Sequence, residues 1–340
     1  GNRMPRSAIL GCAGPQLSRA EHRFFAEQDP LGFILFARNC ETPEQVRALV
    51  DQLRAAVGRG DAPVLIDQEG GRVQRLKPPT WRQAPAPARF AEMAERDPEA
   101  AQEAARLNAQ LLAHEVGELG ITVDCLPCLD IRVPGASEVI GDRSFGADPQ
   151  RIAALGKAVV DGLLMGGVLP VIKHIPGHGR ALVDSHHELP RVDADLASLR
   201  ASDFPPFAEL VGEYWAMTAH VIYQAIDPER PATLSPTVIG RTIREEIGFD
   251  GVLISDDLSM KALSGGFERR AADSLAAGCD LVLHCNGDRE EMAAVMAGTG
   301  ALSGEAVRRV QMGERARHAW AQPLDVDAAR ARLDGLMAGA

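Results

Sequence analysis

Short apolar runs alternate with longer amphipathic segments along the chain. The apolar runs, which we interpret as strands, cover residues 7–14, 32–37, 62–69, 121–131, 168–175, 215–220, 251–257 and 280–285. Segments rich in Ala, Leu, Glu and Arg with helical spacing cover residues 43–58, 97–119, 149–166, 196–212 and 267–278. Strands that alternate with helices pair in parallel. The pattern therefore predicts an α/β fold, a single (β/α)8 TIM-type barrel, with a doubly wound open sheet as the alternative.

The length of 340 residues falls within the range of one such barrel. The Pro-rich stretch 76–90 follows the third predicted strand and reads as a long loop, so no linker divides the chain. About fifty-five residues follow the last predicted strand, enough for a closing helix and a tail. We expect residues 1–340 to form one domain.

Charge and composition exclude some partners. The formal net charge is −11, which gives no general attraction for nucleic acid or for an anionic membrane. No run approaches the 18 apolar residues of a membrane span, and the apolar stretch before Cys12 is far shorter than a signal peptide needs. A chain of this size does not need its six cysteines as disulfides. We expect a cytoplasmic protein that binds neither nucleic acid nor membrane.

Polar residues gather where the predicted strands end. They are Asp67, Glu69, Asp130, Lys173, His174, His220, Asp256, Asp257 and His284. In a barrel, functional side chains collect at the C-terminal ends of the strands. This distribution predicts a site at that end.

The segment 173–187 holds four of the nine histidines, and Pro176, Gly177 and Gly179 make it a loop. Asp184 and His186 are two residues apart, so the carboxylate could orient the imidazole as in a catalytic triad. The alternative is a solvated surface loop in which Asp184 caps a helix.

Two pairs of residues have spacings that occur in metal-binding sites. His174 and His178 are four apart, but Pro176 and Gly177 between them prevent the helix on which that spacing works. Cys125 and Cys128 lie in a predicted strand, where residues three apart point to opposite faces. We therefore expect buried structural thiols and no bound metal.

Two further segments carry candidate chemistry. FDGVLISDDLSM (249–260) ends an apolar strand in paired carboxylates, one of which could instead cap a helix. IDQEGGRVQRL (66–76) combines a Gly-Gly turn with acidic and basic residues, which suits a hydroxyl-rich ligand. No Gly-rich phosphate-binding motif accompanies them, so we expect no nucleotide.

Together these segments resemble glycoside hydrolase family 3, and within it the NagZ-type β-N-acetylhexosaminidases of bacterial cell-wall recycling. The resemblance rests on IDQEGGRVQRL, VIGDRSFG (139–146), KHIPGHG (173–179) followed by DSH (184–186), MTAHVIY (217–223) and GFDGVLISDDLSM (248–260). It extends from about residue 7 to residue 285.

The resemblance implies a role for each matching residue. Asp256 is similar to the family nucleophile, His186 to its acid/base and Asp184 to the partner of that histidine. Matching sugar-binding positions are Asp67, Arg75, Arg143, Lys173 and His174. The implied substrate is a terminal β-linked N-acetylglucosamine, in nature joined to an anhydro-N-acetylmuramic acid with or without its peptide, and no cofactor is implied.

The proposed chemistry is self-consistent, because a retaining glycosidase needs a nucleophilic carboxylate and a proton donor, and a histidine titrates near neutrality. Three alternatives stay open at this point: a family-3 phosphorylase, a non-catalytic sugar-binding barrel and a metal-dependent barrel hydrolase.

Overall fold

The computed structural model describes residues 3–136, 138–182, 189–260 and 263–339. Its main sheet has nine parallel strands in the order β7-β6-β3-β2-β1-β13-β12-β10-β8. They are β1 (Arg6–Leu10), β2 (Pro30–Leu35), β3 (Val64–Ile66), β6 (Val123–Asp124), β7 (Leu169–Pro170), β8 (Ile172–Ile175), β10 (Trp215–Thr218), β12 (Val252–Asp257) and β13 (Leu281–His284). The two strands at the ends of this order, β7 and β8, are separated only by Val171, so the sheet closes on itself. The predicted α/β barrel is confirmed.

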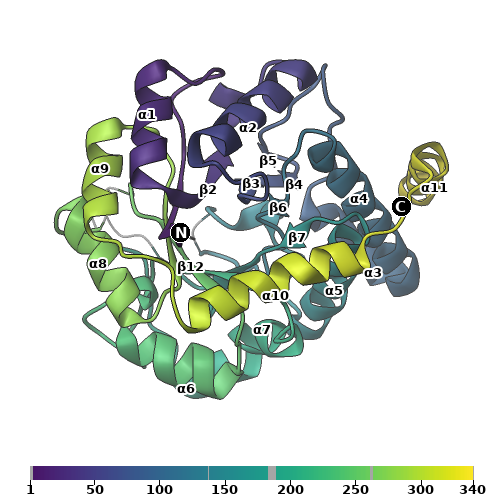
Figure 1. Ribbon diagram of the computed structural model, residues 1–340. Coiled ribbons are helices and arrows are strands. Elements are labelled where there is room, and N and C mark those ends of the chain that lie inside the picture. The colour runs from purple at the N-terminus through teal and green to yellow at the C-terminus, as the bar shows by residue number, and fades with distance from the viewer. Residues whose placement is uncertain (1–2, 137, 183–188, 261–262, 340) are drawn as a thin grey trace.

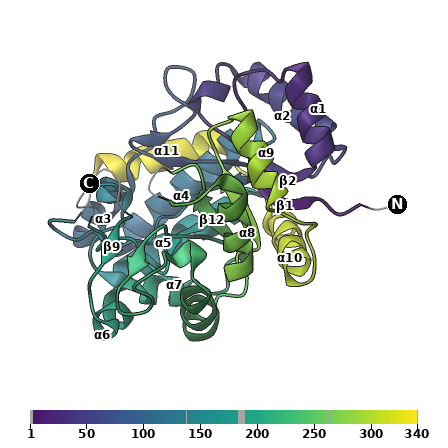
Figure 2. The ribbon, with the colours of Figure 1, turned by 90° about the vertical axis from the view of Figure 1, so that its left-hand side faces the viewer.

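Helices surround the sheet (Figure 1). They are α1 (Arg19–Gln28), α2 (Pro43–Val57), α3 (Pro87–Arg96), α4 (Pro98–Gly117), α5 (Pro149–Met165), α6 (Leu196–Ser198), α7 (Pro205–Glu209), α8 (Phe267–Ala277), α9 (Arg289–Ala297), α10 (Glu305–Trp320) and α11 (Val326–Ala338). Helices α2, α4 and α5 begin with the same pattern, a capping side chain followed by a proline. Thr42, Asp97 and Asp148 cap them, each followed by a proline at the first helical position. The C-terminal α11 packs on α4 (Figure 2).

The predicted helix over 196–212 is interrupted. The structure has α6, a π-helical turn over Leu199–Asp203 and the short α7 instead. Pro205 and Pro206 explain the break, because a proline inside a helix removes a hydrogen bond and clashes with the preceding turn.

Two buried clusters follow from the two-residue period of the strands. On β13, Leu281 and Leu283 point into the barrel, while Val282 points out toward the helices. On β12, Ile254 points into the barrel and Leu253 out. The interior is thus filled with aliphatic side chains, and the mouth above it is left for polar ones.

Two short pairs of strands form part of the mouth of the barrel. The hairpin of β4 (Gln68–Gly70) and β5 (Val73–Gln74) follows β3 directly, and β9 (Arg191–Val192) pairs with β11 (Ile222–Tyr223). Gly70 and Gly71 both have positive φ in the turn of the hairpin, a conformation that glycine adopts without strain. The sequence therefore folds the segment after β3 back over the barrel.

Cys125 and Cys128 are both fully buried, as the sequence predicts. Cys125 belongs to the aliphatic cluster inside the barrel. The thiol of Cys128 lies 3.3 Å from Oδ2 of Asp130. None of the helices in the described part of the chain combines the length and the hydropathy that crossing a bilayer requires.

Candidate active site

A pocket of about 300 Å³ opens at the C-terminal ends of the strands. It brings together six of the eight site residues expected from the sequence. These are Asp67, Arg75, Arg143, Lys173, His174 and Asp256. Because they come from four separate segments of the chain, only closure of the barrel places them around one cavity.

Glu69 is the central anion beneath this pocket. Its side chain is fully buried and receives two hydrogen bonds from Arg143, Nε to Oε1 at 3.0 Å and Nη2 to Oε2 at 2.8 Å. Lys173 Nζ lies 2.7 Å from Oε2 of the same carboxylate. Burial alone would raise the pKa of Glu69, but the two cations outweigh it and hold the pKa at about 2.

The same two cations stay charged. Burial would lower the pKa of Lys173, yet Glu69 and Asp67 raise it above its ordinary value. Asp67 lies 3.4 Å from Lys173 Nζ and 3.2 Å from Nη2 of Arg75. The wall of the pocket thus presents a carboxylate, an ammonium and guanidinium groups with fixed charges. Such a set can bind several hydroxyl groups at once.

Asp130 anchors the loop that carries the histidines. Its Oδ1 accepts the backbone N–H groups of His174 and His178 at 3.1 and 2.8 Å, and its Oδ2 lies 2.7 Å from Nδ1 of His174. Burial would raise the pKa of Asp130, but the two imidazoles and these hydrogen bonds hold it well below its usual range. With Nδ1 facing Asp130, the other ring nitrogen of His174 is the one free to bind a ligand in the pocket.

The paired carboxylates at the end of β12 have different surroundings. Asp257 Oδ1 accepts the backbone N–H groups of Ser259 and Cys285, and its Oδ2 accepts the Ser259 hydroxyl at 2.6 Å. Asp256 accepts one backbone hydrogen bond, from Asp257 at 2.8 Å, and lines the pocket half-buried. Asp257 therefore secures a turn, while Asp256 keeps an oxygen available for a ligand.

Neighbouring imidazoles keep Asp256 ionised. Burial would raise the pKa of its carboxyl, but His220, His174 and the backbone N–H of Asp257 lower it overall. His220 is itself fixed, because its Nε2 donates to the carbonyl of Asp257 at 2.9 Å and its Nδ1 lies 2.7 Å from the Thr233 hydroxyl. An ionised carboxylate in a pocket with cationic walls is suited to act as a nucleophile.

Asp184 and His186 lie outside the residues that the structure describes. The described chain stops at Leu182, which exchanges two backbone hydrogen bonds with Arg191, and resumes at residue 189. Their predicted roles as acid/base and its partner therefore stay predictions.

The sequence patterns do not indicate the apolar part of the pocket. Phe36, Met260 and Cys285 also line it. The guanidinium of Arg75 lies 5.0 Å from the centre of the Phe36 ring, a cation–π contact. Phe36 directly follows β2 at its C-terminal end, and that position is the signal by which it could have been found.

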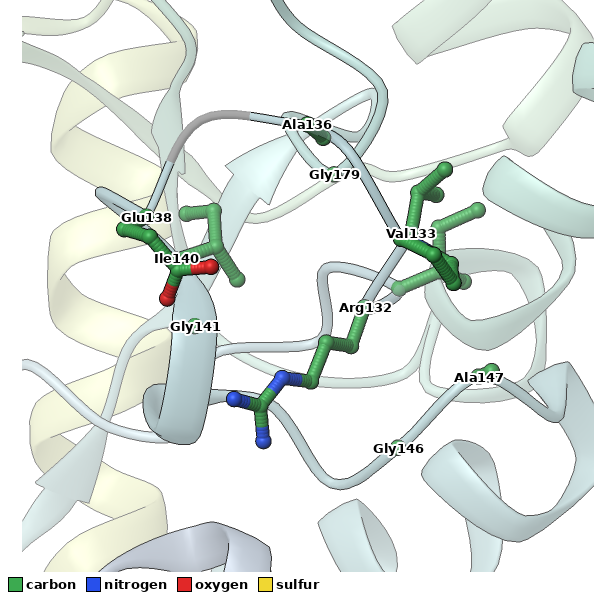
Figure 3. Close-up of a pocket in the computed structure, with 11 residues that line it drawn as sticks. Arg132, Val133, Ala136, Glu138, Ile140, Gly141, Gly146, Ala147 and Gly179 are labelled. Carbon is green, nitrogen blue, oxygen red and sulfur yellow. The ribbon is translucent and has the colours of Figure 1, made fainter.

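A second cavity of about 290 Å³ lies beside residues 140–143 and 178–179, which also border the active-site pocket (Figure 3). Ile140, Gly141 and Gly179 line it, whereas their neighbours Arg143 and His178 line the active-site pocket. The side chain of Arg132 extends along it and is exposed. Residues 140–143 and 178–179 thus lie between this cavity and the active-site pocket.

A parallel α/β barrel with a charged pocket at its C-terminal end defines the class as a barrel enzyme. Comparison with known proteins identifies the family. The chain belongs to glycosyl hydrolase family 3, whose N-terminal domain matches residues 10–313.

Relatives narrow the family assignment. The chain is 42% identical over 282 residues to a β-hexosaminidase of Alkalilimnicola ehrlichii, covering 82% of this chain and 80% of the relative. It is 37% identical over 316 residues to a β-hexosaminidase of Idiomarina loihiensis, covering 91% and 93%. The crystal structure of NagZ from Neisseria gonorrhoeae in complex with N-trifluoroacetyl-D-glucosamine matches with a TM-score of 0.87 and 33% identity over 99% of this chain and 100% of that one. The protein is a glycoside hydrolase of the β-hexosaminidase kind.

Proposed function

We propose that the protein is a retaining β-N-acetylhexosaminidase that removes terminal β-linked N-acetylglucosamine. The observation that carries this proposal is the position of Asp256 in one pocket with Asp67, Arg75 and Lys173. An ionised carboxylate faces a set of groups able to hold sugar hydroxyls, and this is what a retaining glycosidase requires. The N-trifluoroacetyl-D-glucosamine bound by the gonococcal protein supports an amino sugar as the ligand class.

In this mechanism Asp256 attacks the anomeric carbon and forms a covalent glycosyl-enzyme. The leaving oxygen must take up a proton at the same time, and we assign its delivery to His186, with Asp184 orienting the imidazole. In the second step the same imidazole removes a proton from water, which attacks the anomeric carbon and releases Asp256. The configuration at that carbon is inverted twice and therefore retained.

The remaining site residues bind the sugar. Asp67 accepts hydrogen bonds from hydroxyls, while Arg75, Arg143, Lys173 and His174 donate or accept around the ring. Ion pairs with Asp67 hold Arg75 and Lys173, and an ion pair with Glu69 holds Arg143, before substrate arrives, which lowers the cost of ordering these side chains on binding. No cofactor takes part in the mechanism.

The natural substrate that we propose is N-acetylglucosamine linked to anhydro-N-acetylmuramic acid, with or without its peptide, released during peptidoglycan recycling. We place the protein in the cytoplasm, where its six free cysteines would stay reduced. We also propose that residues 1–340 act as one catalytic domain.

The test is turnover of 4-nitrophenyl N-acetyl-β-D-glucosaminide in buffer without phosphate, followed by optical assay of the first-formed sugar anomer. The proposal expects hydrolysis with the β-anomer formed first. Turnover that requires phosphate, or an α-anomer as the first product, would overturn it.

A further inference from the structure

Three metal-ligating side chains of different kinds meet beneath the active-site pocket. The Cys128 thiol, the Asp130 carboxylate and the His174 imidazole each offer one ligand atom, and these atoms all lie within 4.8 Å of one another. All three residues are buried, with His174 the most exposed at 6%. Cys128 and His174 each belong to a short motif whose other member, Cys125 or His178, is not in the cluster.

The separations are close to those that a tetrahedral metal ion imposes. Bonds of roughly 2.0–2.3 Å to zinc place neighbouring ligand atoms roughly 3.3–3.6 Å apart. The Cys128 Sγ to Asp130 Oδ2 distance is 3.3 Å, and the Asp130 Oδ2 to His174 Nδ1 distance is 2.7 Å. The second pair has to open to bind a metal ion, and the third separation, between the Cys128 and His174 ligand atoms, is at most 4.8 Å.

The backbone holds the ligands in place beforehand. Leu129 N–H donates to the carbonyl of Lys173 at 2.7 Å, and Lys173 N–H donates to the carbonyl of Pro127 at 3.1 Å. These bonds clamp the segment carrying Cys128 and Asp130 against β8, which carries His174. A thiol that can lose its proton to a metal ion, together with an imidazole and a carboxylate, favours a borderline-soft ion such as Zn²⁺ over Mg²⁺ or Ca²⁺.

We propose that Cys128, Asp130 and His174 form a Zn²⁺ site through which the ion inhibits the enzyme. The ion enters from the pocket side, where His174 is accessible. Binding forms three metal–ligand bonds and releases one proton, from the Cys128 thiol. The proton that Nδ1 of His174 shares with Asp130 moves to Nε2, so the imidazole stays neutral when it coordinates the ion through Nδ1. The hydrogen bond between Asp130 and His174 is replaced by bonds to the metal, so the imidazole leaves its sugar-binding orientation.

Two surrounding groups favour this site. Burial and the Asp130 carboxylate raise the pKa of the Cys128 thiol, and the guanidinium of Arg143 is the nearby charge that opposes them. Nδ1 of His178 is buried without a hydrogen-bond partner among the described residues, and its ring centre lies 5.7 Å from that of His174. The His178 imidazole thus lies against that of His174, with one ring nitrogen that no described residue binds.

The test measures metal binding without any substrate, so it is independent of the proposed function; only the inhibitory consequence rests on that function. Chelator-treated protein is titrated with Co²⁺, whose bond to a thiolate gives a charge-transfer band in the near ultraviolet, and then with Zn²⁺ by calorimetry. The variant Cys128→Val removes the ligand and keeps an apolar side chain of similar size. Cys125→Val is the matched control in the same motif, and Cys128→Ser replaces the first variant if that one does not fold.

We expect the band in the wild type and in Cys125→Val but not in the Cys128 variants. Their Zn²⁺ affinity falls by at least about 10–100-fold, the loss that disturbing even an outer-shell partner causes. Inhibition of nitrophenyl turnover by Zn²⁺ weakens by the same factor. A Cys128 variant that keeps the band, or wild-type protein that binds Co²⁺ without a thiolate band, would overturn the proposal. So would Zn²⁺ binding that persists in Cys128→Val and is lost in His186→Ala.

Discussion

Glu69 accepts hydrogen bonds from Lys173 and Arg143 in a position that solvent does not reach, with the Lys173 Nζ atom 2.7 Å from Oε2. Removing one partner of a buried ion pair leaves the others uncompensated and costs about 3–5 kcal/mol. Glu69→Gln keeps the shape and removes the charge. We expect the free energy of unfolding to fall by about that amount in urea titrations.

The matched control for Glu69→Gln is Glu103→Gln, because Glu103 forms an ion pair with Arg332 on the exposed surface. Pairs of that kind contribute about 0.2–1 kcal/mol. Equal losses in the two variants would mean that the buried cluster is not coupled as its distances imply.

Glu213 links stability to pH at a position away from the pocket. Burial raises the pKa of its carboxyl to about 7, and its Oε1 has no hydrogen-bond partner among the described residues. An unfolded chain has a glutamate pKa of about 4.3, so between these values the folded protein holds more protons and its stability falls as pH rises. Glu213→Gln removes this penalty.

We therefore expect Glu213→Gln to stabilise the protein relative to wild type by on the order of 1–3 kcal/mol more at about pH 8 than at about pH 5. Urea unfolding at the two pH values measures this difference. Glu209→Gln, on the exposed end of α7, is the control and should show no such difference. A Glu213→Gln effect that is independent of pH would contradict the account.

The strand pattern predicts the barrel because alternation of apolar residues is a local property. The structure bears out every predicted strand position, but some strands are shorter: the run 121–131 keeps only Val123–Asp124 as regular strand. Pro127 explains part of this, since proline has no N–H to donate to a ladder. Pro205 and Pro206 likewise indicate a break, although the helical spacing of the neighbouring residues predicts a continuous helix.

Sequence patterns predict only part of the site. Charged residues at strand ends indicate which end of the barrel is functional. The sequence does not indicate that Glu69 pairs with both Arg143 and Lys173, because those contacts depend on how the barrel closes. Nor does it indicate that a cysteine of one motif meets a histidine of another around Asp130.

The proposed acid/base predicts a dependence on the leaving group. A nitrophenolate departs without a proton and a sugar alkoxide does not. General acid catalysis is typically worth about 10²–10⁴-fold. His186→Ala should therefore slow release from a disaccharide by roughly that factor while largely sparing glycosylation by the nitrophenyl substrate.

Stopped-flow measurement of nitrophenol release tests this. His186→Ala should show a burst, because the imidazole is then missing from the slower deglycosylation step. Asp184→Asn should show a weaker form of the same behaviour by misorienting the ring. Equal losses on both substrates without a burst would remove His186 from the role.

The central claim is that Asp256 is the nucleophile. Acetamido sugars also allow an alternative in which the substrate's own N-acetyl group attacks and no ester to the enzyme forms. Incubation with a slow fluorinated glycosyl donor, followed by peptide mass mapping, distinguishes the two. The account predicts inactivation with one sugar attached to the peptide that contains Asp256, and no label in Asp256→Ala. Inactivation without a label, or a label on Asp257 or Glu69, would contradict it.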